Sequence, residues 1–183
     1  DALSANFASY LLNDLQLKKG DRIAIMLPNL LQYPIAIFGA LRAGLTVVNT
    51  NPMYTARELK HQLVDSGAKV IVVMEMFAHT VAEVVKETPI QQVVTTCVGD
   101  MLGFPKGPLI NFVFKHIKKA IPEYSLPGSV TFNDALSAGK QHTLPTIDIR
   151  SSDIAFLQYT GGTTGVAKGA MLTHRNLVAN MQQ

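Results

Sequence analysis

The sequence is poor in cysteine, and this scarcity excludes two classes of protein. Its single cysteine, Cys97, has no partner for an intrachain disulfide and no other ligand at metal-site spacing. A disulfide-stabilised secreted domain and a thiolate metal site are therefore excluded. We expect a cytoplasmic protein, because free thiols persist in the reducing cytosol. Cys97 stands in an apolar run and is interpreted as a small core residue.

Long apolar runs are also missing. The most apolar stretch, residues 30–48, is interrupted by Gln32, Pro34, Arg42 and two glycines. A membrane-spanning helix needs about 20 mostly apolar residues in succession. We therefore expect no transmembrane helix in this sequence.

The excess of one charge is small. Lysine and arginine number 16 against 13 aspartate and glutamate residues, and the net charge is +3. The basic residues are scattered except between Lys106 and Lys119, and no DNA-binding helix pair or platform of aromatic and arginine side chains is recognisable. Nucleic acid is therefore not an expected partner. The 48% apolar composition instead predicts a globular protein with a buried core.

Residues 1–98 alternate amphipathic stretches with short apolar runs, which is typical of βα repeats. The expected strands are 22–27, 45–49, 69–74 and 92–98, and the expected helices are 5–17, 29–43, 55–67 and 78–87. Asn29 is expected to cap the second helix and Gly44 to end it, while Thr55 and Glu58 have the spacing of a capping box. The sequence predicts an α/β fold with a layered, mostly parallel sheet and crossover helices.

Residues 99–144 interrupt this rhythm with many glycines and prolines, and we expect an insertion or excursion there. Within it, residues 109–121 predict a helix with Asn111 and three lysines on one face and apolar side chains on the other. Two interpretations stay open. The favoured one is a helix packed on its own domain with a solvated lysine face. The other is peripheral contact of residues 106–121 with the inner face of an anionic membrane.

The ends of the chain are expected to be internal points of a longer protein. Asp1 is not an initiator Met, and Gln183 stands in an expected helix that starts near Arg175 and has no stop signal. Residues 145–183 are expected to form strands at 147–150 and 152–159, a loop, another strand and a helix start. We expect residues 1–183 to be an incomplete N-terminal portion of a larger domain.

The loop from Tyr159 to Gly169 has a composition suited to a polyphosphate. It reads Tyr-Thr-Gly-Gly-Thr-Thr-Gly-Val-Ala-Lys-Gly and directly follows an apolar strand. Glycines let backbone N–H groups turn toward an anion, threonines add hydroxyl donors, and lysine adds a charge. The Walker A pattern fails, because Ala167 precedes the lysine and Gly169 follows it, and the dinucleotide pattern G-x-G-x-x-G fails as well.

The loop resembles the phosphate-binding loop of the adenylate-forming superfamily, which comprises acyl-CoA synthetases, luciferases and peptide-synthetase adenylation domains. That loop usually reads Tyr/Phe-Thr-Ser-Gly-(Ser/Thr)-Thr-Gly-x-Pro-Lys-Gly, before an apolar strand and Thr/Ser-His. Here Thr173 and His174 occupy the last two positions. Gly161 replaces Ser and Ala167 replaces Pro, and both changes resemble those of bacterial long-chain fatty acid:CoA ligases. Residues 20–68 resemble further landmarks of the family.

The resemblance implies that the chain is part of the large N-terminal, AMP-binding domain of a long-chain fatty acid:CoA ligase. Its substrates would be a fatty acid, ATP and coenzyme A, with Mg²⁺ on the phosphates. The implied ATP-phosphate contacts are Thr160, Gly161, Gly162, Thr163, Thr164, Gly165 and Lys168. No residue is assigned as a catalytic base or a metal ligand. For His174 a local hydrogen-bonding role is favoured over a catalytic one.

Two alternatives stay open. Other acyl or aryl acid ligases and amino-acid adenylation domains share these landmarks, which give no information on the pocket that binds the acid. A non-catalytic ATP-binding or membrane-recruited module is of a different class, and it would bind nucleotide or liposomes without turnover. Arg57, Glu58 and His61 are interpreted as exposed helix residues rather than site residues.

The 183-residue chain alone is predicted to show no ATP–pyrophosphate exchange. The resemblance implies that the magnesium-binding Glu, the ribose-binding Asp and the adenylation lysine of the family lie beyond Gln183. Radiolabelled pyrophosphate exchange by the purified chain measures this, with a mock purification from the same host as the control for contaminating ligase. Exchange above that control contradicts the prediction.

Overall fold

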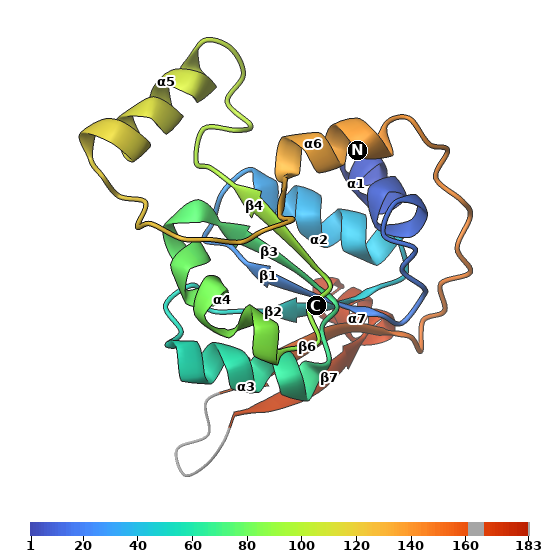
Figure 1. Ribbon diagram of the computed structural model, residues 1–183. Coiled ribbons are helices and arrows are strands. Elements are labelled where there is room, and N and C mark those ends of the chain that lie inside the picture. Colours follow the sequence, from blue (N-terminus) through green and yellow to red (C-terminus); the bar gives the residue numbers. More distant parts are fainter. Residues whose placement is uncertain (161–166, 183) are drawn as a thin grey trace.

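The computed structural model describes residues 1–160 and 167–182. In these residues seven strands form one sheet between two layers of helices (Figure 1). In chain order the strands are β1 (Arg22–Met26), β2 (Thr46–Asn49), β3 (Val70–Met74), β4 (Gln92–Thr96), β5 (Val130–Thr131), β6 (Ile154–Thr160) and β7 (Lys168–Thr173). Across the sheet the order is β5-β4-β3-β1-β2-β6-β7, and only the β6–β7 pair is antiparallel. The expected α/β fold with a mostly parallel sheet is confirmed.

Helices cover both faces of the sheet (Figure 1). One face carries α1 (Ala2–Asn13), α2 (Gln32–Arg42) and α6 (Phe132–Gly139). The other face carries α3 (Ala56–Ser66) and α4 (Ala78–Val84), and α4 lies between the short turns η1 (Glu75–Phe77) and η2 (Val85–Glu87). Each layer closes its own hydrophobic cluster against the sheet.

The central strands read as continuous apolar runs because both of their faces are buried. Ile23 and Ile25 of β1 pack in the cluster under α1 and α2, whereas Ala24 and Met26 pack in the cluster under α3 and α4. All five residues of β3 are buried as well. Successive side chains of a strand point to opposite faces, so a strand covered on both sides shows no alternation of polarity.

Two of the expected helix-end signals are confirmed, and one is wrong. Thr55 and Glu58 form the expected capping box of α3. Gly44, with φ 71°, takes the left-handed conformation expected after the second helix. Asn29 was expected to cap that helix, and this prediction is wrong: Leu31 is the N-cap of α2 and Asn29 lies in the preceding turn.

One expected helix is shorter than predicted, and one expected strand is absent. The first helix ends at Asn13 rather than 17, because Gln16 has a φ of 53°, which an α-helix does not accommodate. Residues 147–150, expected as a strand, are connecting chain beside Lys19, whose Nζ donates to Asp148 O at 2.5 Å.

Part of residues 99–144 belongs to the core, which the sequence analysis did not predict. β5 pairs in parallel with β4, and α6 packs on α1. Phe132 is fully buried there, and its ring centroid lies 4.9 Å from that of Phe7. A strand of two residues is too short to show the alternation of apolar and polar residues, so the sequence did not predict its pairing with β4.

The remainder of this segment carries α5 (Lys106–Phe112) and a π-helical turn, η3 (Val113–Ile117). Asn111 was expected on the solvated lysine face, but it points inward: its Oδ1 accepts from Gly99 N–H at 2.8 Å, and its Nδ2 donates to Asp100 Oδ1 at 2.8 Å. The amide satisfies a turn that would otherwise leave polar groups unpaired. In the described ranges no helix is long and apolar enough to cross a membrane.

Gly139→Ala is predicted to lower the free energy of unfolding by about 2 to 4 kcal/mol, because α6 contacts the backbone of α1 at this point. An added Cβ would overlap Asn6 O and lie 2.8 Å from Tyr10 N. Chemical denaturation measures the change. Ser137→Ala, on the exposed side of α6, is the control and should change stability by less than about 0.5 kcal/mol. Equal effects of the two substitutions would contradict this packing.

Candidate phosphate-binding site

The loop expected to bind phosphate lies between two antiparallel strands at one edge of the sheet. β6 ends at Thr160 and β7 begins at Lys168, and these two residues oppose each other across the ladder. Both are exposed. The other expected phosphate contacts, Gly161, Gly162, Thr163, Thr164 and Gly165, lie outside the described residues. The structure therefore brings Thr160 and Lys168 together at the base of the loop.

This base lies at the carboxyl edge of the parallel strands. β1, β2 and β6 run in one direction, so their carboxyl ends share an edge, which is where open α/β sheets bind ligands. A hollow of about 250 Å³ occupies this edge. Its lining is Ile25, Leu27, Tyr33, Asn49, Thr50, Asn51, Tyr54, Gln158 and Tyr159.

A short polar network lines the hollow. Tyr33 Oη donates to Asn49 Oδ1 at 3.1 Å, and Asn49 Nδ2 donates to Gln158 Oε1 at 3.0 Å. Burial raises the pKa of Tyr33, so its hydroxyl remains a donor at neutral pH. The sequence analysis did not identify these residues. The available signal was a polar residue near the carboxyl end of an apolar strand, at Asn49 in β2 and at Gln158 in β6.

Helix α3 lies beside the β6–β7 hairpin and contacts both ends of the loop, at Tyr159 of β6 and at Ala167, which precedes β7 (Figure 1). Tyr159 Oη donates to Asp65 Oδ2 at 2.5 Å. Burial, and then the hydrogen bond to Asp65, raise the pKa of Tyr159. His61 Nε2 lies 3.3 Å from Ala167 O. His61 had been interpreted as an exposed helix residue, whereas it is half-buried against the end of the loop.

After β7 the chain turns into α7 (His174–Met181). Thr173 is its N-cap and forms a capping box with Asn176, whose backbone N–H donates to Thr173 Oγ1 at 3.3 Å. The backbone N–H of His174 donates to Asp153 O at 3.1 Å. The junction is therefore fixed to the start of β6 by local hydrogen bonds.

All residues from 1 to 183 match the family model described as AMP-binding enzyme. The chain belongs to this family of AMP-binding enzymes. The antiparallel hairpin at the carboxyl edge is thus a feature of an AMP-binding enzyme.

Curated relatives resemble this AMP-binding enzyme along nearly its whole length. The long-chain-fatty-acid–CoA ligase of Salmonella typhimurium is 56% identical over 180 residues, which are 98% of this chain and 32% of that protein. The long-chain-fatty-acid–CoA ligase of Bacillus subtilis is 41% identical over 169 residues, 91% of this chain and 30% of that protein. The chain thus spans about a third of the length of the curated relatives it matches.

Solved structures agree with the fold. A long-chain-fatty-acid-CoA ligase from Archaeoglobus fulgidus is 27% identical, with a TM-score of 0.73, over 98% of this chain and 30% of that one. ATP-bound MatB from Rhodopseudomonas palustris has a TM-score of 0.71 at 24% identity, over 99% of this chain and 30% of that one, and it supports the fold alone.

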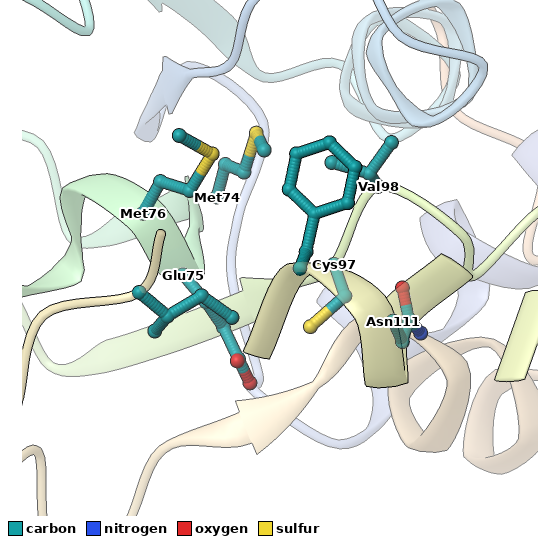
Figure 2. A pocket seen from close by; sticks show the side chains of 8 residues that line it. Met74, Glu75, Met76, Cys97, Val98 and Asn111 are labelled. Carbon is teal, nitrogen blue, oxygen red and sulfur yellow. The ribbon is translucent and has the colours of Figure 1, made fainter. Parts of the chain in front are cut away.

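A second hollow of this AMP-binding enzyme lies between the sheet and α5. Figure 2 shows the side chains of Met74, Met76 and Cys97 around it, and Phe114 lines it too. Its volume of about 10 Å³ leaves room for no more than about one water. Burial, and then the neighbouring Glu75, raise the pKa of the Cys97 thiol, which is therefore a poor nucleophile. We interpret this hollow as a small packing gap between α5 and the sheet rather than as a ligand site.

Proposed function

We propose that the full-length protein is an ATP-dependent long-chain fatty acid:CoA ligase and that this chain supplies its phosphate-binding hairpin. The observation that carries the proposal is the similarity to the Salmonella typhimurium ligase across nearly the whole chain. The hairpin geometry supports it. Thr160 and Lys168 place a hydroxyl and an ammonium group opposite each other at the carboxyl edge, a combination suited to a polyphosphate.

The proposed reaction has two steps. A carboxylate oxygen of the fatty acid attacks the α-phosphorus of ATP, and the bond from this phosphorus to the bridging oxygen breaks, giving acyl-adenylate and pyrophosphate. The sulfur of coenzyme A then attacks the acyl carbonyl carbon, AMP leaves, and the thiol loses its proton. Displacement at phosphorus is accelerated mainly by positioning and charge stabilisation. Groups that bind the departing pyrophosphate therefore carry the first step.

The roles of the hairpin residues follow from this chemistry. Lys168 is proposed to stabilise the charge of the departing pyrophosphate, and Thr160, Thr163 and Thr164 to donate hydroxyl hydrogen bonds. The loop glycines would add backbone donors. Among residues 1–160 and 167–182 no group of three His, Cys, Asp or Glu side chains is placed to hold a metal ion. We propose that Mg²⁺ binds the phosphates of ATP, whose charge it would share.

Lys168→Ala is predicted to lower ATP–pyrophosphate exchange by the full-length protein about 100-fold, because one charge on the departing pyrophosphate is lost. Exchange is measured with acetate, octanoate, palmitate and a panel of amino acids, and the wild-type rate should rise with acyl chain length. Lys140→Ala, at an exposed lysine after α6, is the control and should leave the rate unchanged.

The outcomes separate the alternatives. Exchange with an aryl acid or an amino acid alone would make the protein another acid ligase or an adenylation domain. Bound ATP without exchange for any acid would favour the non-catalytic ATP-binding or membrane-recruited module. An unchanged rate in Lys168→Ala would contradict the role of the hairpin.

We also propose that the segment 102–121, which adds residues 102–105 to the expected contact of residues 106–121, contacts an anionic membrane. This contact would place the protein in the cytoplasm, peripherally on the inner face. Its only charged side chains are those of Lys106, Lys115, Lys118 and Lys119. Its exposed large apolar side chains are Leu102, Phe104, Leu109, Phe112 and Ile117. Phe104 is 92% exposed and Ile117 is 67% exposed. Exposed apolar groups beside lysines, with no acid between them, suit an anionic bilayer interface.

Replacing Lys115, Lys118 and Lys119 by Gln is predicted to weaken binding of the full-length protein to phosphatidylglycerol vesicles about 100-fold, since each lysine near an anionic surface contributes about 1 kcal/mol. Co-sedimentation measures the affinity, and phosphatidylcholine vesicles provide the uncharged comparison. Replacing Lys18, Lys86 and Lys140 by Gln changes the net charge equally and should have little effect. An equal loss in both triple variants would contradict a specific contact surface.

A further inference from the structure

The end of β6 that leads into the loop extends beyond the pairing of β6 with β2. Gln158 is the last residue of β6 to pair with β2, opposite Asn49. Tyr159 and Thr160 continue past that point and pair only with β7 among the described strands. β7 is itself the outermost strand. We call the chain on either side of the loop, at the end of β6 and at the start of β7, the two stems of the hairpin. The ladder holds these stems to each other but does not fix them against the helical layers.

The first stem is attached to α3 through Tyr159. This side chain is only 8% exposed and packs in the same cluster as Leu59 and Leu63 of α3. Its hydroxyl donates to the Asp65 carboxylate at 2.5 Å. Gly169 lies opposite Tyr159, and a Cβ there would come within 3.0 Å of the tyrosine ring, so glycine leaves room for the ring in this position.

The second stem is attached to the same helix through Ala167. His61 Nε2 lies 3.3 Å from Ala167 O. A carbonyl oxygen only accepts, so Nε2 carries the proton in this hydrogen bond. The Ala167 side chain also packs against the cluster that contains Tyr159. Both ends of the loop are therefore fastened to one element.

The helix that makes these contacts is well anchored. His61 and Asp65 are four residues apart, so they lie on one face of α3. The helix has a complete capping box at its start, and Leu59 and Leu63 are fully buried. Each attachment point immediately precedes a proposed phosphate contact: Tyr159 precedes Thr160, and Ala167 precedes Lys168.

We propose that His61 and Asp65 are positioning residues, which fix the paired stems of the hairpin against α3 and so place Thr160 and Lys168 to bind one triphosphate. The inference rests on the proposed function of the loop. It assigns these residues no contact with substrate. Their effect is transmitted through Ala167 O and Tyr159 Oη.

The first test requires no catalysis. Hydrogen exchange of the full-length protein without ATP is measured on peptides covering 154–160 and 167–173. Asp65→Ala and His61→Leu are expected to raise the rate of hydrogen exchange at these stems about 10-fold, because the free energy of one lost hydrogen bond corresponds to about that factor. Tyr159→Phe, which keeps the buried ring, should act in the same direction and serves if Asp65→Ala fails to fold. Arg57→Ala, exposed on the same helix, should change nothing.

The second test asks whether the attachment matters for ATP. In ATP–pyrophosphate exchange, Asp65→Ala and His61→Leu are expected to raise KM for ATP about 10-fold and to leave KM for the fatty acid and the melting temperature unchanged. His61→Gln retains an N–H donor for Ala167 O and should restore KM for ATP. The double variant Tyr159→Phe/Asp65→Ala should be no worse than either single variant, since both remove one hydrogen bond.

Unchanged hydrogen exchange at the stems would overturn the attachment itself. Faster hydrogen exchange with an unchanged KM for ATP would overturn the positioning role. A lower melting temperature accompanied by a rise in both KM values would reduce the contacts to general stability. If the wild-type protein lacks pyrophosphate exchange with every acid, the proposed function fails, while the hydrogen-exchange result still decides whether α3 holds the hairpin.

Discussion

The parallel pairing of β2 with β6 is the contact on which the arrangement of the site depends. It joins Asn49 to Gln158, which are 109 residues apart in the chain. This register places the carboxyl ends of β1, β2 and β6 at one edge and directs Tyr159 into the cluster under α3. A shift of one residue would turn every side chain of β6 to the opposite face. Tyr159 would then lose Asp65, and Gln158 would lose Asn49.

Such a distant pairing needs compensation for the entropy of closing a long loop, although this cost grows only slowly with length. The intervening chain supplies it by forming β3, β4 and β5 on the other side of β1, together with the helices that cover them. α3 follows β2 directly and returns the chain toward β3, which leaves one of its faces beside the hairpin (Figure 1). The helix that completes the crossover is therefore the same helix that contacts both stems.

Local physics made a large part of this fold predictable. The buried strands appear as apolar runs, and the capping box at Thr55 and the left-handed Gly44 mark helix ends. The anion site that the loop sequence indicates stays a prediction. Tertiary contacts were not predictable in the same way. Asn111 carries no sequence signal that distinguishes a solvated amide from one that completes a distant turn at Gly99, and nothing local relates His61 to Ala167. β5 is too short to show a period, so its place beside β4 emerged only in three dimensions.

In each stem, one residue packs against the domain and the next residue is exposed. Side chains that bind a phosphate must remain accessible, so the domain cannot immobilise them by burying them. In a strand, neighbouring side chains point to opposite faces. Tyr159 is buried, and Thr160 next to it is exposed; Ala167 is half-buried, and Lys168 next to it is exposed. An anchoring residue one position before each proposed phosphate contact is therefore the nearest place at which the domain could restrict that contact without covering it.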